Sequence, residues 1–381
     1  MKYRSARKLA GILLAFTLLL SGCQLTELPG TPQSKAAIPG AEVTLSAMPV
    51  PVGVGAHLDE APVIPPPEPE PEEEPLPEEP ELPEIPEEPE APEETPLFPD
   101  HLHIVAGQAF AYDLTEGKML AMKGEGESLY PASTTKLLTI LLAQRYLDLE
   151  MLVTPGSEQT LILPNSSIAC VDIYDTVTVE QLIEGMLLPS GNDAAHALAA
   201  AVGRAVTGEW NLGGIEAVEI CVEAMNQYAQ ELGMVSTHFA NVDGYLDSEH
   251  YTTVEDMAIV SVLAAQDEVI RKYCGLVMDT VTYPSGDQVT WYNSNLMLYS
   301  GNQWYNPHVT GMKTGSLLSH YSLVCTVEIG NKTYVTGVFT APSTEDRYYD
   351  MNTIIKWLET IHEDTAAAEE VVASQTEGET P

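Results

Sequence analysis

The chain has 381 residues, of which 44% are hydrophobic, so it is long enough for one large domain or two ordinary ones. Its 56 acidic and 16 basic residues give a formal net charge of −40 at pH 7. Because binding to nucleic acid depends on basic side chains that contact phosphates, this charge argues against a nucleic-acid partner.

The first 23 residues have the pattern of a bacterial export signal. Basic residues at positions 2, 4, 7 and 8 precede an apolar stretch over 9–20, which is too short to span a bilayer. The motif L-S-G-C at 20–23 resembles a lipobox, whose cysteine is lipidated; an ordinary signal peptide with a nearby cysteine is the alternative. We therefore expect a lipoprotein signal peptide over 1–22. Lipid on Cys23 would anchor the protein to the membrane in the bacterial cell envelope, outside the cytoplasm.

Residues 23–100 are predicted to form a disordered tether. Within it, residues 65–96 contain 14 Glu and 13 Pro and no basic residue. Proline favours the polyproline II conformation and like charges repel, so this segment is expected to be extended, at about 3.1 Å per residue. It is either a spacer that holds a domain away from the membrane or a linker without a length requirement.

Ordered structure is expected from His103 onward, in a domain over 101–364. Alternating apolar residues predict strands over 103–113 and 118–123. A helix over 133–147 is apolar around most of its circumference and should be buried, and 151–178 has the pattern of turns and short strands. Further helices are predicted over 179–188, 192–205, 215–232, 253–266 and 345–361, and further strands over 276–282, 288–292, 321–329 and 332–340.

Strands at both ends of this domain, with helices between them, indicate an α+β fold in which helices cover one antiparallel sheet. The dipeptide Gly330-Asn331 separates the last two predicted strands and is typical of a hairpin turn. The tail over 365–381 is acidic and rich in alanine, and it is predicted to be disordered.

The cysteines and histidines do not form a metal-binding pattern. None of the five cysteines lies in a CxxC pair, which argues against a thiolate zinc site or a redox motif. Apart from Cys23, four cysteines allow three full pairings; since Cys221 and Cys325 lie in apolar runs, we expect most of the four to be buried free thiols. His238 and His250 lack the spacing of zinc ligands and are expected to have structural roles. No metal or cofactor is predicted.

Three short segments contain residue types that suit nucleophilic catalysis. Ser133 and Lys136 lie one turn apart at a predicted helix start, so their side chains share one face. A serine nucleophile needs a base, and a lysine can be that base only when burial or a neighbouring cation lowers its pKa. The other two segments are Ser190-Gly191-Asn192, between two predicted helices, and Lys313-Thr314-Gly315, before a predicted strand. Each segment alone is more typical of an ordinary cap or turn.

Together, in the order S-x-x-K, S-x-N and K-T-G, the segments match the signature of penicillin-binding proteins and serine β-lactamases. The chain resembles the low-molecular-weight D-alanyl-D-alanine carboxypeptidases (peptidase family S11) more closely, through P-A-S-T-T-K at 131–136, H-F-A-N-V-D-G at 238–244 and H-Y-T-T-V-E-D-M-A at 250–258. The resemblance covers 103–361 and implies a β-lactamase/transpeptidase-like α+β fold, with an antiparallel sheet flanked by helices and a helical subdomain.

The resemblance also implies roles for the residues of the first two motifs. Ser133 would attack the carbonyl between two D-alanines and form an acyl-enzyme, and Lys136 would take its proton. Ser190 would pass a proton to the leaving D-alanine. Asn192 would hold Lys136 and the substrate backbone.

The third motif would bind the substrate. Lys313 and Thr314 would hold the terminal carboxylate, and Lys313 would also help to keep the first lysine neutral. Gly315 would let the strand backbone approach the substrate. The backbone N–H groups of Ser133 and Ser316 would form the oxyanion hole.

The sequence departs from the family pattern after K-T-G. Leu317, His320 and Tyr321 replace the usual Thr, Ala and Gly, a change that bears on substrate specificity and efficiency rather than on the catalytic groups. Some family members use a further arginine for the substrate carboxylate, but residues 276–312 contain none.

The implied activity is that of a serine-type D-Ala-D-Ala carboxypeptidase, which removes the terminal D-alanine from peptidoglycan stem pentapeptides and is acylated by β-lactam antibiotics. Three alternatives stay open: a non-catalytic or slow penicillin-binding-like wall receptor, a DD-endopeptidase, and a class A β-lactamase. The last needs a glutamate that positions a deacylating water, and no E-x-E-L-N-like segment lies between 193 and 312.

Overall fold

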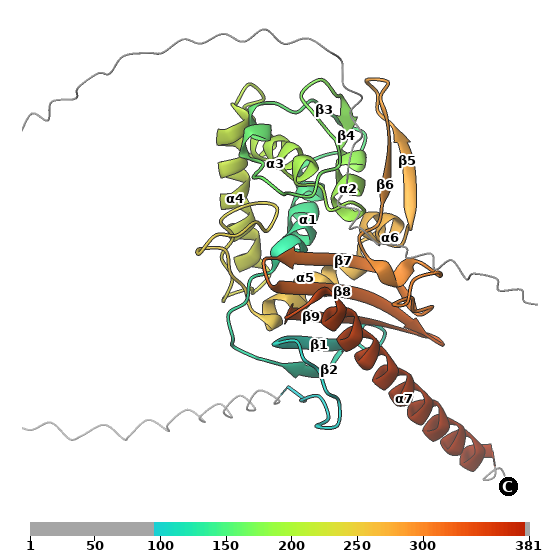
Figure 1. Ribbon diagram of the computed structural model, residues 1–381. Helices are drawn as coiled ribbons and strands as arrows, with labels where there is room; N and C mark the ends of the chain where they lie inside the picture. The colour runs from blue at the N-terminus through green and yellow to red at the C-terminus, as the bar shows by residue number, and fades with distance from the viewer. Residues whose placement is uncertain (1–94, 378–381) are drawn as a thin grey trace, which may run out of the picture. The chain divides into compact units, whose positions relative to one another are not determined.

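The computed structural model describes residues 95–377, and it describes side chains as far as Thr365. The predicted signal peptide, Cys23 and nearly all of the predicted tether lie outside the described residues. The centre of the fold is a five-stranded antiparallel sheet, as predicted (Figure 1). In spatial order its strands are β2 (Lys118–Lys123), β1 (Gln108–Asp113), β9 (Lys332–Ala341), β8 (His320–Ile329) and β7 (Val309–Leu317).

Helices cover both faces of this sheet. On one face lie α1 (Lys136–Tyr146) and α5 (Val254–Gln266), and α2 (Val179–Leu187), α3 (Asn192–Thr207) and α4 (Gly214–Glu231) pack around α1 (Figure 1). The other face is covered by α7 (Thr344–Glu377), whose C-terminal part extends away from the folded body (Figure 1).

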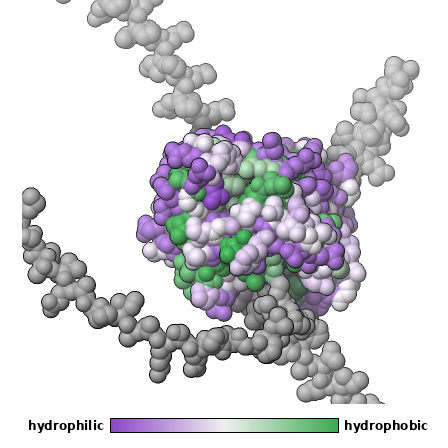
Figure 2. Space-filling view, turned by 90° about the horizontal axis from the view of Figure 1, so that it is seen from above, coloured by the Kyte–Doolittle hydropathy of each residue, from purple (hydrophilic) through white to green (hydrophobic). Residues whose placement is uncertain are grey.

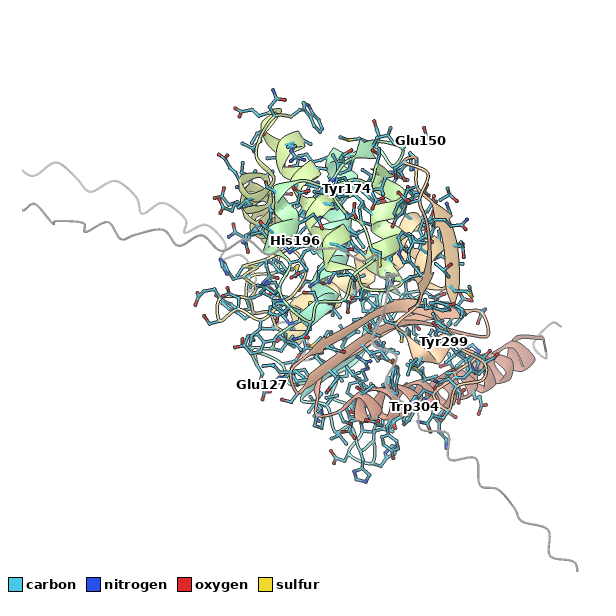
Figure 3. All side chains as sticks on the ribbon, turned by 45° about the horizontal axis from the view of Figure 1, so that its top comes forward. Glu127, Glu150, Tyr174, His196, Tyr299 and Trp304 are labelled. Atoms are coloured by element: carbon cyan, nitrogen blue, oxygen red, sulfur yellow. The ribbon has the colours of Figure 1, made fainter. Side chains whose placement is uncertain are left out.

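The alternation of side chains along β8 and β9 explains this two-sided packing. Val324 and Phe339 belong to the core cluster that contains α1 to α5, whereas their neighbours Leu323 and Val338 pack in the cluster that contains α7. Successive side chains of a strand point to opposite faces, so an almost continuous apolar run buries both faces of the sheet. Figure 3 shows Trp304 and Tyr299 beside the sheet near α7, where Trp304 stacks on Tyr348 at 5.8 Å between ring centroids.

The predicted helices are confirmed, with small shifts at their ends except for the C-terminal end of the last one, α7. The start of α2 is fixed by a capping box in which Thr178 Oγ1 accepts from the Gln181 N–H at 3.1 Å, and Gln181 Oε1 accepts from the Thr178 N–H at 3.0 Å. The helix predicted over 133–147 begins instead with a 3-10 turn, η1 (Ala132–Thr135), before α1. This turn places Ser133 outside the regular helix.

Two pairs of short strands lie outside the main sheet. The segment 151–178 holds β3 (Leu152–Val153), β4 (Val177–Thr178) and the 3-10 helix η2 (Ser157–Leu161), in agreement with the prediction of turns and short strands. The strands predicted over 276–282 and 288–292 are β5 (Met278–Thr282) and β6 (Gln288–Tyr292). They form a separate two-stranded ribbon, visible in Figure 1 beside α2.

Three elements differ from the prediction. Strand β7 was not predicted, because Gly311, Lys313 and Gly315 interrupt its apolar pattern. The short helix α6 (Glu268–Cys274) was also missed. The tail prediction was wrong for 365–377, since α7 continues to Glu377 as a single helix. Alanine and glutamate are strong helix formers, so an acidic, alanine-rich segment can prolong a helix that packing has already nucleated.

Three cysteines match the expectation of buried free thiols: Cys221, Cys274 and Cys325. Burial raises the pKa of Cys221 and Cys274 to about 12, so both thiols stay protonated at neutral pH. Over the described part of the chain, no helix combines the length and apolarity needed to cross a bilayer. Figure 2 shows one face of the molecule, on which hydrophobic groups are interspersed with hydrophilic ones.

Candidate active site

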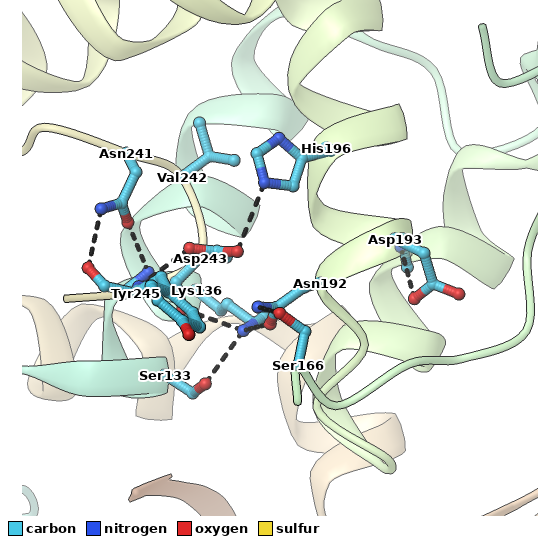
Figure 4. Close-up of polar contacts among 12 residues, drawn as sticks. Ser133, Lys136, Ser166, Asn192, Asp193, His196, Asn241, Val242, Asp243 and Tyr245 are labelled. Carbon is cyan, nitrogen blue, oxygen red and sulfur yellow. Dashed lines mark hydrogen bonds and ion pairs between the residues drawn. The ribbon is translucent and has the colours of Figure 1, made fainter. Parts of the chain in front are cut away.

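The first motif brings a serine and a buried lysine together where η1 joins α1. Lys136 Nζ donates to Ser133 Oγ at 3.0 Å (Figure 4). Lys136 is completely buried, whereas Ser133 is partly exposed. Ala132, directly before the serine, has a φ of 51°, a conformation that is uncommon for a residue with a side chain. The serine hydroxyl is thus available to a ligand, while its lysine partner is shielded from water.

Two further acceptors hold the lysine amine. Lys136 Nζ donates to Asn192 Oδ1 at 2.7 Å and to the backbone carbonyl of Asp243 at 2.9 Å. Burial lowers the pKa of Lys136 to about 8, against the opposing effect of the negative charges of Asp243 and Asp193. A substantial fraction of this lysine is therefore neutral near physiological pH and can accept a proton.

The second and third motifs also place a buried lysine beside a serine. Lys313 Nζ on β7 donates to Ser190 Oγ at 2.8 Å and to the carbonyl of Thr314 at 2.9 Å. Ser190 has a φ of 63°, which places its side chain on a sharp turn between α2 and α3. Burial, together with the nearby charges of Lys136 and Arg347, lowers the pKa of Lys313 well below its ordinary value.

The rest of the third motif lies along β7 beside η1. Thr314 Oγ1 and Ser294 Oγ are 2.6 Å apart and share a hydrogen bond. A Cβ added to Gly315 would lie 3.0 Å from the Pro131 carbonyl oxygen, a tight contact that glycine avoids where the strand packs against the turn that carries Ser133. Ser316, the next residue, is exposed at the end of this contact.

Comparison with known proteins agrees with this geometry. The sequence profile of the D-alanyl-D-alanine carboxypeptidase family (peptidase S11) matches residues 94–343. The chain belongs to this family.

Individual relatives support the assignment. The D-alanyl-D-alanine carboxypeptidase of Streptomyces sp. K15 is 31% identical over 269 residues, which are 67% of this chain and 87% of that protein. The D-alanyl-D-alanine carboxypeptidase DacF of Bacillus subtilis is 30% identical over 247 residues, which are 64% of this chain. The match spans only 59% of the Bacillus protein's own length.

Solved structures share the fold. The Streptomyces K15 DD-transpeptidase superposes with a TM-score of 0.60 at 29% identity, over 67% of this chain and 97% of that one. A D-alanyl-D-alanine carboxypeptidase from Mycobacterium tuberculosis gives a TM-score of 0.57 at 25% identity, over 67% of this chain and 91% of that one. The chain therefore has the β-lactamase/transpeptidase-like α+β fold that the sequence resemblance implied.

In this family member, two acidic residues that the sequence analysis did not single out support the motif side chains. Asp193 Oδ1 and Oδ2 accept from the backbone N–H groups of Ala169 and Val171, at 2.7 and 2.9 Å, and so fix the segment before β4. Asp243 is buried and lies 3.3 Å from His196 Nε2 (Figure 4). Burial favours the protonated form of Asp243, but the hydrogen bond from His196 and the charge of Lys136 outweigh it and lower its pKa to about 2.

Ser166 is a third polar residue that the sequence analysis missed. Asn192 Nδ2 donates to Ser166 Oγ at 3.0 Å, so the amide that holds Lys136 is itself held by the segment between η2 and β4. Nothing in the local sequence distinguishes this serine from other loop serines, because the contact joins residues that are 26 positions apart.

Arg347 at the start of α7 is an arginine that the sequence analysis could not place. Its Nη1 donates to the Gly315 carbonyl and to Ser316 Oγ, both at 3.0 Å, and its Nε has no partner among the described residues. The helical spacing of the sequence could have revealed this arginine. Arg347, Met351 and Ile354 are spaced so that they share one face of a helix, and this face of α7 is buried. An arginine on that face must reach toward the sheet.

His238 and His250 support the loop that ends in Asp243. His238 Nδ1 is hydrogen-bonded to the Glu249 carbonyl at 2.5 Å, and His250 Nε2 lies 2.9 Å from Thr135 Oγ1. Burial lowers the pKa of His250 to about 4, so this ring stays neutral in ordinary buffers. Among the described residues, no group of three or more His, Cys, Asp or Glu side chains is arranged to hold a metal ion.

Proposed function

We propose that this protein is a serine-type D-Ala-D-Ala carboxypeptidase that removes the terminal D-alanine from peptidoglycan stem pentapeptides. The observation that carries the proposal is the hydrogen bond from the buried Lys136 to Ser133, in a site that also holds the pair Lys313–Ser190. A lysine with a pKa near 8 is close to the value that suits a general base at neutral pH.

In the proposed reaction, neutral Lys136 removes the proton from Ser133 Oγ while this oxygen attacks the carbonyl carbon of the penultimate D-alanine. The resulting oxyanion accepts hydrogen bonds from the backbone N–H groups of Ser133 and Ser316, a contribution typically worth about 10²–10³ in rate. The C–N bond then breaks, and the leaving amine of D-alanine takes a proton through Ser190, which is hydrogen-bonded to Lys313. Water hydrolyses the acyl-enzyme and restores the serine.

We further propose that the third motif and Arg347 bind the terminal carboxylate of the substrate. The carboxylate would accept hydrogen bonds from the hydroxyl groups of Thr314 and Ser316 and from the amine of Lys313. Asn192 would hold the substrate backbone. Arg347 contacts Ser316 Oγ directly and adds a fixed positive charge behind β7. β-Lactam antibiotics carry a carboxylate and a strained amide, so the same groups would lead them to acylate Ser133.

The place of action is also a proposal. Cys23 in its L-S-G-C motif would carry lipid and anchor the protein to the outer face of the cytoplasmic membrane, with residues 23–100 as the tether. Labelling with a clickable palmitate analogue in a bacterial host tests this directly. Incorporation that is lost in Cys23→Ala supports the anchor, and unlabelled wild-type protein contradicts it.

The deciding experiment for the activity uses the chain without its first 22 residues. Free D-alanine released from a peptide that ends in D-Ala-D-Ala is measured for the wild type and for Ser133→Ala. We expect release by the wild type alone, together with labelling by fluorescent penicillin that the variant loses. A folded wild type that binds penicillin without releasing D-alanine would instead favour a receptor. Cleavage of cross-linked peptides only would favour an endopeptidase. Rapid hydrolysis of penicillin would favour a β-lactamase.

A further inference from the structure

The histidine His196 on α3 is buried beside the candidate active site and has no role in the reaction described above. Its Nε2 lies 3.3 Å from the carboxylate of Asp243 (Figure 4). The residue is only 5% exposed, and its Nδ1 has no hydrogen-bond partner among the described residues. The positions of α3 around it hold buried alanine, leucine and valine. Since a buried polar atom without a partner is unfavourable, packing alone does not account for a histidine here.

His196 shares one helix face with Asn192, the first residue of α3. The two lie four positions apart, and side chains at this spacing are neighbours on the helix surface. Asn192 Oδ1 accepts a hydrogen bond from Lys136 Nζ at 2.7 Å. His196 contacts Asp243, whose backbone carbonyl accepts from the same Nζ at 2.9 Å. One face of α3 therefore reaches the lysine amine twice, once directly and once through Asp243.

Asp243 is held through both oxygens of its carboxylate. Oδ1 accepts from the backbone N–H of Tyr245 at 2.9 Å, and Oδ2 faces His196 Nε2. A ring nitrogen that faces an ionised carboxylate carries the proton, so the neutral ring is protonated at Nε2. The side chain and the backbone carbonyl belong to the same residue. A carboxylate that is fixed at both oxygens therefore restricts the backbone of Asp243 and keeps its carbonyl directed at Lys136.

The direction of this carbonyl matters for the chemistry of Lys136. In the neutral, reactive state the amine has two hydrogens and one lone pair. The oxygens of Asn192 and Asp243 that contact it can only accept, so they take the two hydrogens. The lone pair is then left for the third neighbour, Ser133 Oγ, at 3.0 Å. If the carbonyl turned away, the amine could rotate, and its lone pair would no longer face the hydroxyl group that it deprotonates.

We propose that His196 is a positioning residue for the general base. It holds Asp243 so that the Asp243 carbonyl fixes the amine of Lys136 with its lone pair toward Ser133. This inference rests on the proposed function, in which Lys136 takes the proton of the serine. Because His196 acts through Asp243, it affects the proton transfer and not the binding of the peptide.

The test replaces His196 by side chains that keep or lose the donor. In His196→Gln, the amide nitrogen lies as many bonds from Cβ as Nε2 does, so it can reach Asp243. His196→Leu has no donor, and His196→Asn carries the same amide on a shorter side chain. In these two variants, kcat for D-alanine release and the rate of acylation by penicillin should both fall about ten- to hundredfold, with KM little changed. In His196→Gln both rates should stay within about threefold of the wild type, because the donor is restored.

A double-mutant cycle locates the effect. Asp243→Ala removes the carboxylate but keeps the backbone carbonyl, so adding His196→Leu in that background should change kcat less than about twofold. The matched control is His308→Leu, which removes another histidine–carboxylate pair, with Glu359 of α7 at 3.1 Å. It should leave both rates unchanged. Thermal unfolding of every variant checks that it is folded.

The outcomes separate this inference from the proposed function. Equal losses in His196→Leu and His196→Gln, or full activity in both, would overturn the role of His196. A loss that persists in the Asp243→Ala background, or that appears in KM alone, would overturn it as well. If the wild type is acylated by penicillin but releases no D-alanine, the carboxypeptidase is refuted and the acylation rates decide the role of His196. A wild type that is not acylated either would refute both, since Lys136 would then not act as a base on Ser133.

Discussion

The two buried lysines of the site lie in opposite electrostatic surroundings. Lys136 is close to the carboxylates of Asp243 and Asp193, whereas the charged groups that act on Lys313 are the cations Lys136 and Arg347. Since both side chains are fully buried, burial alone does not distinguish them. The difference indicates that, without substrate, Lys136 beside the carboxylates holds its proton more strongly than Lys313.

A substrate carboxylate would reverse this order. Bound beside Thr314, it would supply the negative charge that the surroundings of Lys313 lack and would raise the pKa of Lys313. The proton would then favour Lys313 and leave Lys136 neutral, as a general base must be. We infer that substrate binding itself prepares the base, and the following predictions test this comparison.

Removing the base should have the largest effect. We expect Lys136→Ala to lower kcat/KM for D-alanine release by about 10³-fold or more, because serine and lysine act as a unit. The rate of acylation by penicillin should fall in parallel. Unchanged circular dichroism would show that the variant is folded, and a loss of less than tenfold would mean that another group takes the proton.

Removing the second lysine should cost less and should depend on the substrate's charge. Lys313→Ala is expected to lower kcat/KM about 10²-fold, because it deletes a charged hydrogen-bond donor to the carboxylate and the cation that helps to keep Lys136 neutral. With a substrate whose terminal carboxylate is replaced by an amide, wild type and variant should differ much less. An equal loss for both substrates would contradict the assigned role of Lys313.

The pH dependence should identify the electrostatic partner of Lys136. Because the base must be neutral and its pKa is about 8, kcat/KM of the wild type should rise with pH and level off above this value. Asp243→Asn removes a negative charge that raises this pKa, so the rise should move to lower pH, by about one unit. Glu249→Gln, in the same loop but exposed, is the control and should leave the profile in place. A shift to higher pH would refute the assignment.

Burial should also shift the pKa of a buried carboxyl group. For a carboxyl group with acidic neighbours this shift is upward, whereas it is downward for the lysines. Burial, together with Asp279 and Glu180, raises the pKa of Glu184 on α2 from 4.5 to about 8. The folded state then binds a proton that the unfolded state has lost, so stability falls as pH rises between these two values. Glu184→Gln should abolish this fall and raise Tm at pH 8 by about 2 °C or more. An identical pH dependence of Tm in both proteins would exclude the effect.

The motif residues could be predicted from the sequence because each motif is local. S-x-x-K, S-x-N and K-T-G each fit within a few residues, and the structure brings Ser133, Lys136 and Asn192 together as the resemblance implied. The supporting residues could not be found in this way. Ser166 and His196 reach the site only through contacts between distant segments, and no short pattern marks them. Asp243 lies within the segment 238–244 that carries the resemblance, but its contact with Lys136 joins positions 107 apart.

The fold, too, has elements that the sequence predicts and elements that it does not. The sheet and most helices follow from apolar periodicity, but β7 does not, since Gly315 packs closely against η1 and has a low strand propensity. The end of α7 was misjudged because composition alone does not show that packing on the sheet nucleates the helix.

The beginning of the described chain has a mechanical consequence. Leu97 pairs with Met122 on β2, and the Phe98 ring contacts Trp357 on α7 at 5.3 Å. A force that pulls on the chain from its N-terminal side would therefore load β2 and α7 first. Neither element carries Ser133, Ser190 or Lys313. Trp357 also lies ten positions beyond Arg347, about 15 Å along the helix. Force applied to the chain before Leu97 would thus act on the edge strand β2 and on α7. The groups around Ser133 would therefore keep their geometry under load.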